Sequence, residues 1–449
     1  MIAKNSTHPI KITDINNLGY GVGKIDGMVT FVAGAVTGDE LEVKIIKVNK
    51  SYLVARMERI IAPSPHRAAD DCPVGVRCGG CVYRHITYGH ELELKRAYVK
   101  SCFAKAGLKD IDVAPVRTTG KVDSYRNKAQ YPVAAGKNGV NIGFFAVKSH
   151  EIVNTGSCPL QPAAFGGICA EIKAFMEDYK ITPYDETTRK GCVRHIYLRH
   201  AKSTGEIMVC VVVNTHGLAH GDKLAERLVR SFPEIKSVML NINDKNTNVV
   251  LGEKYVSLYG RQYITDVLSD KRFKISAGSF YQVNHDAAEL LYAEAKKKVD
   301  IKSTDTVLDL YCGIGTIGLC IASEAKELWG VEIVDEAVKC AIENARLNGA
   351  ENAHFVCADA GDPFPADMPA PDVIILDPPR KGCAKELIER IAGLGIPKVV
   401  YISCAPDTLA RDAAIFSKLG YAPDTVVPVD MFPRTGHVET VVLMSRVER

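Results

Sequence analysis

The chain has 449 residues, of which 47% are hydrophobic and 24% charged, and its formal net charge is +3. This length exceeds one ordinary core and predicts about three domains of a soluble globular protein. No apolar run approaches the roughly 20 residues that cross a bilayer, and residues 1–6 contain no signal-peptide core. We therefore expect a cytoplasmic protein without a membrane partner. The mild positive charge allows a polyanionic partner but does not require one.

Short strands separated by glycines are predicted in the first domain, for which we expect the bounds 1–61. A small β-barrel of the OB type fits this pattern, and such barrels commonly bind single-stranded nucleic acid. A packing module without a ligand fits it equally well. The strands are expected at Ile10–Ile12, Met28–Val32, Leu41–Ile46 and Tyr52–Arg56.

Three cysteines, Cys72, Cys78 and Cys81, lie close together among glycines and a proline that let the backbone fold around an ion. Cys158, which is followed by a proline, is the best candidate for a fourth ligand. Fourteen cysteines in a chain without a secretion signal indicate metal binding or catalysis at some of them rather than a disulfide framework. Four thiolates suit a 4Fe-4S cluster or structural zinc, and the residues alone do not separate the two.

We expect residues 62–272 to form a central α+β region that carries these cysteines and contacts RNA. A helix is predicted from His90 to Gly107 and is expected to pack on the C-terminal domain. Beyond it, cations alternate with aromatic side chains, as unstacked RNA bases require, although a solvated strand face over an ordinary core gives the same pattern. These side chains belong to Arg117, Lys121, Tyr125, Arg126, Lys128, Tyr131, Lys137, Phe144, Phe145 and Lys148.

Strands and helices alternate from residue 273 to 449, which predicts an α/β domain with a parallel, doubly wound (Rossmann-like) sheet. In such sheets, ligands bind at the carboxyl ends of the strands. The expected strands are Thr306–Leu310, Leu328–Glu332, His354–Asp359, Asp372–Asp377 and the strand that ends at Cys404.

The first of these strands leads into a glycine-rich turn, Gly313–Gly318, and Glu332 follows at the end of the second strand. Alone, this pattern is the fingerprint of an NAD site. Asp309 argues against NAD, because a carboxylate just before the turn repels a pyrophosphate and attracts a cationic sulfonium. S-adenosylmethionine is therefore the better ligand, with Glu332 accepting hydrogen bonds from its ribose and Asp359 from its adenine amino group.

Two residues near the C-terminus are candidates for covalent catalysis. Cys404 lies where a buried strand meets a turn, whose backbone N–H groups favour the reactive thiolate. The commoner alternative is a small buried cysteine without chemistry. Glu439 begins an apolar run, where a carboxylate is costly unless it is paired or functional, so it is a candidate general base. Asp377, followed by two prolines, projects a rigid carboxylate toward a planar base or amine.

Five motifs together resemble the RNA (uracil-5-)-methyltransferases, specifically those that modify 23S ribosomal RNA. The resemblance covers essentially the whole chain, through Phe280–Asn284, Asp309–Gly313, Asp377–Gly382, Ser403–Pro406 and Gly436–Glu439. In that family the barrel is an RNA-binding TRAM domain, the C-terminal domain is a class I methyltransferase, and four cysteines hold a 4Fe-4S cluster. The resemblance places this cluster at Cys72, Cys78, Cys81 and Cys158. The tRNA-modifying branch usually lacks barrel and cluster, so the implied partner of a monomeric enzyme is 23S ribosomal RNA.

Carried over by position, the resemblance implies S-adenosylmethionine contacts at Gln282, Tyr311, Glu332, Asp359 and Asp377. Cys404 corresponds to the nucleophile and Glu439 to the base. Two positions depart from the family pattern. Ala405 stands where asparagine is usual, which removes an amide that contacts substrate, and Arg434 stands where histidine is frequent.

The expected reaction explains why these residue types are needed. Uracil C5 is a weak nucleophile, and attack of the Cys404 thiolate at C6 raises its electron density. C5 then takes the methyl group, and Glu439 removes the C5 proton before the sulfur leaves. The uridine must first be extruded from its helix or loop. The alternatives are a tRNA uridine methyltransferase, a non-catalytic RNA-binding relic and an NAD-dependent oxidoreductase.

Overall fold

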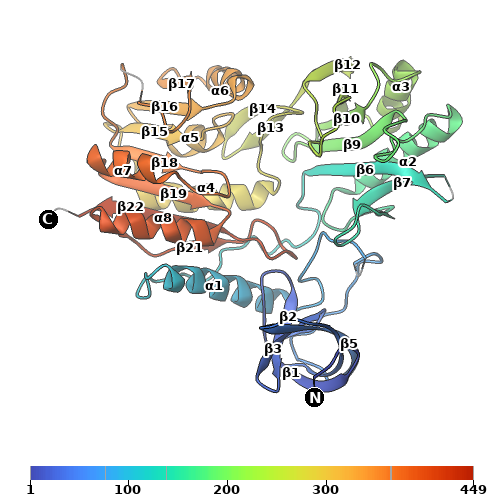
Figure 1. Cartoon of the computed structure of the whole chain (residues 1–449). Coiled ribbons are helices and arrows are strands. Elements are labelled where there is room, and N and C mark those ends of the chain that lie inside the picture. Colours follow the sequence, from blue (N-terminus) through green and yellow to red (C-terminus); the bar gives the residue numbers. More distant parts are fainter. Residues whose placement is uncertain (1, 76, 138, 365–366, 448–449) are drawn as a thin grey trace.

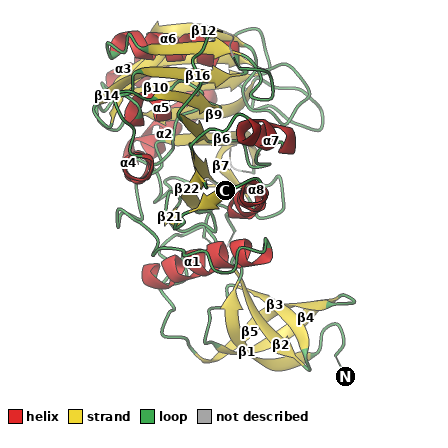
Figure 2. Cartoon of the chain, turned by 90° about the vertical axis from the view of Figure 1, so that its left-hand side faces the viewer, coloured by secondary structure: helices red, strands yellow, loops and turns green. Residues whose placement is uncertain are grey.

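The computed structural model describes residues 2–75, 77–137, 139–364 and 367–447. It contains an N-terminal barrel, a central sheet and a C-terminal sheet (Figure 1). Helix α1 (Tyr88–Lys105) lies between the barrel and the C-terminal sheet, as both views show (Figure 2). Within these residues, no helix is long and apolar enough to cross a membrane.

The N-terminal barrel closes in the order β1-β2-β3-β5-β4, which confirms the expected OB-like fold. Its strands alternate buried aliphatic and exposed polar side chains, so the aliphatic ones fill the interior. Asp39 is fully buried and ties the barrel to the next segment, because its carboxylate pairs with Arg67 at 2.6 Å. The strands are β1 (Thr7–Ile15), β2 (Tyr20–Ile25), β3 (Met28–Ala33), β4 (Glu40–Val48) and β5 (Tyr52–Ala62).

The central sheet is mixed, in the order β12-β11-β10-β9-β6-β7-β8. Helices α2 (Ala163–Asp178) and α3 (Gly221–Ser231) cover one face. On the other face, Tyr197, Met208 and Met239 share a core with the C-terminal part of the chain. The strands are β6 (Lys128–Gly136), β7 (Gly139–Phe145), β8 (Ile152–Asn154), β9 (Val193–His200), β10 (Ile207–Val213), β11 (Ile235–Ile242) and β12 (Lys254–Gly260).

A hairpin of β13 (Tyr263–Leu268) and β14 (Lys271–Ser276) follows and contributes to that shared core. The expected domain limit at residue 272 falls within β14. The division of the chain at residues 61 and 272 stays a prediction.

The C-terminal sheet has the order β17-β16-β15-β18-β19-β22-β20, with β21 paired to β22. Its first five strands are parallel and β22 runs antiparallel to β19, which confirms the predicted doubly wound fold. The strands are β15 (Thr306–Leu310), β16 (Glu327–Glu332), β17 (Ala353–Cys357), β18 (Val373–Leu376), β19 (Lys398–Ser403), β20 (Tyr421–Pro423), β21 (Val427–Val429) and β22 (Glu439–Arg446).

Helices cover both faces of this sheet. One core joins it to α4 and α5, and a second core joins it to α1, α7 and α8. Val99 and Phe103 of α1 are fully buried in the second core, so this helix packs on the C-terminal domain. The helices are α4 (His285–Val299), α5 (Thr316–Ile321), α6 (Asp335–Leu347), α7 (Lys385–Gly393) and α8 (Pro406–Lys418).

Candidate active site

The glycine-rich turn after β15 lies at the carboxyl edge of the C-terminal sheet. Here β15 has β16 on one side and β18 on the other, so this is the topological switch point where doubly wound sheets bind ligands. Gly313 (φ 56°) and Gly315 (φ 80°) have positive φ and allow the tight entry into α5. Tyr311 also has a positive φ of 67°, a strained conformation for a residue with a side chain.

Asp309 is fully buried beneath this turn. Its Oδ2 accepts a hydrogen bond from the Gly318 N–H at 2.9 Å, and its Oδ1 has no partner among the described residues. Burial, together with the Asp377 and Glu332 carboxylates, raises the pKa of Asp309 to about 8, while the hydrogen bond from Gly318 lowers it. A buried carboxyl group with a free oxygen fits a cationic ligand group better than a pyrophosphate. The geometry therefore favours S-adenosylmethionine over NAD.

Glu332 ends β16 beside the same turn. Its Oε2 accepts from the Gly313 N–H at 3.2 Å, and its Oε1 accepts from the Val334 N–H at 2.9 Å. These bonds fix the carboxylate at the switch point. Its position suits a hydrogen bond with ligand hydroxyl groups.

Asp359 lies beyond β17, exposed at the rim of a cavity of about 120 Å³. The cavity is otherwise mainly apolar, with Leu310, Val331 and Phe364 in its lining. Arg390 holds the loop after Asp359, because its guanidinium donates to the carbonyl oxygens of Ala360 and Gly361, both at 2.6 Å. An apolar slot with a carboxylate at its rim suits an adenine ring. Phe364 was not among the predicted site residues, because the chain from Ala360 to it shows no periodic pattern.

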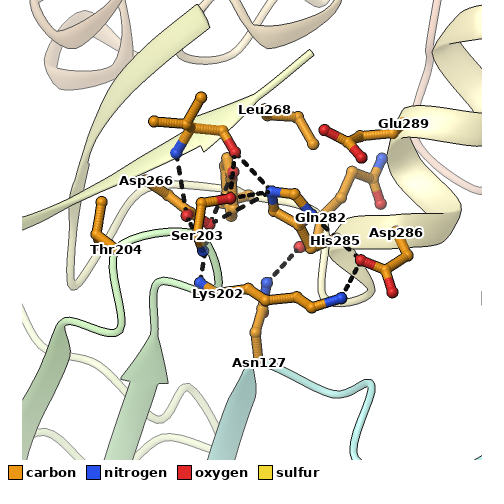
Figure 3. A network of polar contacts seen from close by, with 12 residues as sticks. Asn127, Lys202, Ser203, Thr204, Asp266, Leu268, Gln282, His285, Asp286 and Glu289 are labelled. Carbon is orange, nitrogen blue, oxygen red and sulfur yellow. Dashed lines mark hydrogen bonds and ion pairs between the residues drawn. The ribbon is translucent and has the colours of Figure 1, made fainter. Parts of the chain in front are cut away.

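Gln282 lies in the segment before α4, and side chains from the central part of the chain brace that segment (Figure 3). The Asn127 amide donates to the main-chain oxygen of Gln282 at 3.0 Å. In the β9–β10 turn, the Ser203 N–H donates to Asp266 Oδ1 at 2.8 Å, and Ser203 Oγ lies 3.2 Å from His285 Nε2. The central sheet and the hairpin β13–β14 therefore fix the segment that carries Gln282 and His285.

Cys404 and Glu439 meet where β19 pairs with β22. In this antiparallel ladder Ser403 is opposite Thr440, so the next pair outward is Cys404 and Glu439. Cys404 is half-buried in the turn to α8, and Glu439 is 4% exposed. Asp377 ends the strand on the other side of β19 and raises the pKa of both groups. Three of the predicted site residues thus lie together at one edge.

The groups around Cys404 oppose its ionisation. Burial, Glu439 and Asp377 raise the pKa of Cys404 to about 11, while Arg380 lowers it. Burial and Asp377 raise the pKa of Glu439 to about 8, again opposed by Arg380. The Ala405 N–H of the turn donates to Ser403 Oγ at 3.1 Å. The expectation that turn N–H groups favour the thiolate stays a prediction.

Arg380 lowers the pKa of Cys404, and this effect of Arg380 on the nucleophile was not predicted. It follows Asp377 by three positions, directly after the two prolines, so its nearness to the site was readable from the motif. The motif does not show that Arg380 acts on Cys404, which follows a different strand.

Cys72, Cys78, Cys81 and Cys158 line one cavity of about 250 Å³ between the segment after the barrel and the central sheet. A β-bridge between Cys78 and Ala146 holds the cysteine loop against β7 and β8. Within the described part of the chain, however, no three histidine, cysteine, aspartate or glutamate side chains gather closely enough to hold a metal ion. The four predicted ligands therefore line one cavity but are not drawn together around a single point.

The chain matches known proteins along its whole length. Residues 3–57 match the TRAM domain, and residues 301–418 match a methyltransferase domain. It is 40% identical, over 447 residues, to an uncharacterized RNA methyltransferase of Clostridium tetani, with 99% of this chain and 97% of the relative covered. An uncharacterized RNA methyltransferase of Clostridium acetobutylicum is also 40% identical, over 454 residues, with 100% and 99% covered.

A solved structure shares the architecture. The tRNA (uracil-54, C5)-methyltransferase of Pyrococcus abyssi, in complex with S-adenosyl-L-homocysteine, superposes with a TM-score of 0.79 at 26% identity. The match covers 97% of this chain and 100% of that one. The likeness therefore includes the barrel, the central sheet and the C-terminal sheet.

Proposed function

The chain belongs to the S-adenosylmethionine-dependent RNA methyltransferase family, and from this premise we propose that it methylates C5 of a uridine in 23S ribosomal RNA. One observation carries the proposal: Cys404 and a buried Glu439 are neighbours across β19 and β22, beside the carboxyl edge that fits the methyl donor. A nucleophile and a base on adjacent strands are what C5 methylation through a covalent adduct requires.

S-adenosylmethionine, when bound, supplies the methyl group. The proposed contacts are Glu332 to the ribose, Asp359 to the adenine, and Gln282, Tyr311 and Asp377 around the methionine part and the reacting methyl group. The observation that supports this assignment is that Tyr311, Glu332, Asp359 and Asp377 end or follow neighbouring parallel strands at one edge of the sheet, where Asp309 also has an unpaired oxygen among the described residues.

In the proposed reaction, the Cys404 sulfur adds to C6 of an extruded uracil, and the C5–C6 electron pair forms an enolate. C5 then bonds to the methyl carbon of S-adenosylmethionine while the bond from that carbon to the sulfonium sulfur breaks, and S-adenosylhomocysteine is the leaving group. Glu439 takes the proton from C5, the C5–C6 double bond re-forms, and the sulfur leaves with its electron pair. The pKa of Cys404 is raised to about 11 even with Arg380 beside it, so only a small fraction of the thiol is ionised at neutral pH, and Arg380 keeps that fraction from being smaller still.

We also propose that the four-cysteine cavity holds a 4Fe-4S cluster. The donor set fits, since four thiols line one cavity and Arg84, Arg126 and Lys128 line it too, where they would offset the negative charge of a thiolate-bound cluster. Three of these cysteines belong to the segment after the barrel and Cys158 follows β8, so the cavity joins that segment to the central sheet. We further propose that the enzyme is a cytoplasmic monomer whose domains meet near residues 61 and 272.

The decisive experiment uses 23S ribosomal RNA that contains 5-fluorouridine. Fluorine cannot leave C5 as a cation, so the wild-type protein with S-adenosylmethionine should form a covalent protein–RNA species that survives denaturation. Cys404→Ala should form none while it keeps its melting temperature and its affinity for the methyl donor. A wild-type protein that methylates ordinary RNA without trapping the fluorinated RNA would contradict the covalent route.

A tRNA uridine is the second candidate substrate. It is favoured by the match to a tRNA methyltransferase that covers 97% of this chain. Because that match includes the barrel, the presence of a barrel does not distinguish an enzyme for ribosomal RNA from one for tRNA. Methyl transfer to 23S ribosomal RNA and to total tRNA, measured side by side at equal uridine concentration, distinguishes them. Labelling of tRNA alone would overturn the ribosomal assignment and leave the chemistry intact.

A further inference from the structure

The hairpin that carries Glu439 joins β21 to β22 through residues 430–438. Val429, the last residue of β21, pairs with Glu439, the first residue of β22. Glu439 is therefore at the foot of the hairpin, directly after the connecting residues. The residues of the proposed reaction do not themselves hold residues 430–438 in place.

Four consecutive main-chain oxygens of the hairpin accept hydrogen bonds from four different parts of the chain. Met431 O accepts from the Asn284 amide at 3.0 Å, and Phe432 O accepts from Lys95 Nζ at 3.1 Å. Pro433 O accepts from the Tyr125 hydroxyl at 2.9 Å, and Arg434 O accepts from the N–H groups of Val82 and Tyr83 at 2.9 and 3.1 Å. The hairpin is thus held from the segment after the barrel, from α1, from the central region and from the catalytic domain.

Lys95 occupies the centre of this arrangement. It lies on α1, is 1% exposed, and donates to Glu91 Oε1 and to Asp430 Oδ1, both at 2.7 Å. Glu91 Oε1 in turn accepts from the Arg434 N–H at 2.8 Å, and Asp430 Oδ2 accepts from the Tyr88 hydroxyl at 2.8 Å. Both carboxylates are buried, so removing the lysine leaves Asp430 without a cation at the start of the hairpin and leaves Glu91 of α1 with only the Arg434 guanidinium, at 3.7 Å.

We propose that Lys95 is a positioning residue that, through Glu91, Asp430 and Phe432 O, holds Glu439 where it can take the C5 proton. The inference rests on the proposed function, since it assigns Lys95 to one step of that reaction. Attack by Cys404 and bonding of the methyl group to C5 do not use Glu439. Loosening the hairpin should therefore slow proton removal and the departure of sulfur more than it slows the earlier steps.

The test compares the steps in Lys95→Met and in the milder Asp430→Asn, which keeps the shape of the side chain and serves if the first variant does not fold. With 5-fluorouridine RNA, both variants should form the adduct at the wild-type rate. With ordinary uridine RNA and methyl-labelled S-adenosylmethionine, release of methylated RNA should slow by about tenfold to a hundredfold. The labelled covalent species should accumulate on denaturing gels.

Lys298→Met is the matched control. Lys298 is also a largely buried lysine of this domain, and its Nζ binds Asp424 Oδ2 and Thr425 O, both at 2.6 Å, just before β21. This variant should release product at the wild-type rate. Equal slowing of adduct formation and release, or release at the wild-type rate in a folded Lys95 variant, would overturn the inference. If the wild-type protein forms no adduct with 5-fluorouridine RNA, the proposed function fails first and the inference falls with it.

Discussion

The thiol of Cys404 is surrounded by opposing charges, and Arg380 is the group that lowers its pKa against burial and two carboxylates. Replacing Arg380 by glutamine should raise that pKa further and reduce the thiolate fraction. We expect adduct formation with 5-fluorouridine RNA to slow about tenfold at pH 7, which corresponds to about one pKa unit. Lys381→Gln removes the same charge one position along the chain and should react nearly as fast as wild type. Equal losses in the two variants would mean that Arg380 acts on RNA binding instead.

The pH dependence of product release should report the ionisation of Glu439. A general base must be a carboxylate, and burial with Asp377 raises the pKa of Glu439 to about 8. The rate at which the methylated adduct decays should therefore rise with pH up to about 8 and level off above it. Quenched time courses of adduct decay between pH 6 and pH 9, set by jumps from a common starting pH, measure this step alone. A decay rate that falls as pH rises would exclude Glu439 as the base.

At the scale of single elements, β16 depends on Gly330 for its closeness to β17. A Cβ atom at this position would overlap the ring of Phe355 and would lie 2.9 Å from the Cys312 sulfur. Gly330→Ala should lower the free energy of unfolding by about 1–3 kcal/mol, because the strand must shift to admit the methyl group. Since Glu332 lies two residues further on, the affinity for S-adenosylhomocysteine should fall as well.

Denaturant unfolding and calorimetric titration measure the two effects of Gly330→Ala. Gly393 in α7 is the matched control, because no atom lies within 4 Å of the Cβ position there. Gly393→Ala should leave both quantities close to those of wild type. If Gly330→Ala is destabilised but binds S-adenosylhomocysteine with unchanged affinity, the position of β16 does not control ligand binding.

Strands were predicted well where their residues are buried on both faces. β15, β16, β18 and β19 are largely buried and mainly apolar, and β15 begins and ends at the predicted residues, because burial on both faces favours apolar side chains. β20 and β21 were not predicted, since three residues are too few to show a period. β12 lies at the edge of the central sheet and is largely exposed, so its apolar pattern is weak.

At the scale of the whole molecule, the four-cysteine cavity joins the segment after the barrel to the central sheet, away from Cys404. Protein purified without oxygen should contain about four irons per chain if a 4Fe-4S cluster is present. Cys81→Ser should lose this iron and bind RNA more weakly, with the affinity for S-adenosylmethionine unchanged. Iron analysis, RNA titration and calorimetry measure these three quantities.

Cys357→Ser is the control for that experiment, because Cys357 is exposed and lies outside the cavity. It should keep both the iron and the RNA affinity. A folded, iron-free Cys81→Ser protein with wild-type RNA affinity and activity would exclude a structural role for the cluster. One iron or zinc per chain would indicate a mononuclear site instead.

The sequence by itself determined the barrel, the doubly wound sheet and the short motifs, because strand and turn patterns are local and burial demands apolar residues wherever a strand is covered. It also indicated Cys404 and Glu439 as residues with a chemical purpose. Only the tertiary structure decided that they are neighbours, since the pairing of β19 with β22 joins distant parts of the chain. The same is true of the raised pKa values at that edge and of the buried contact from Lys95 to the hairpin before Glu439, because charge interactions depend on distances in space.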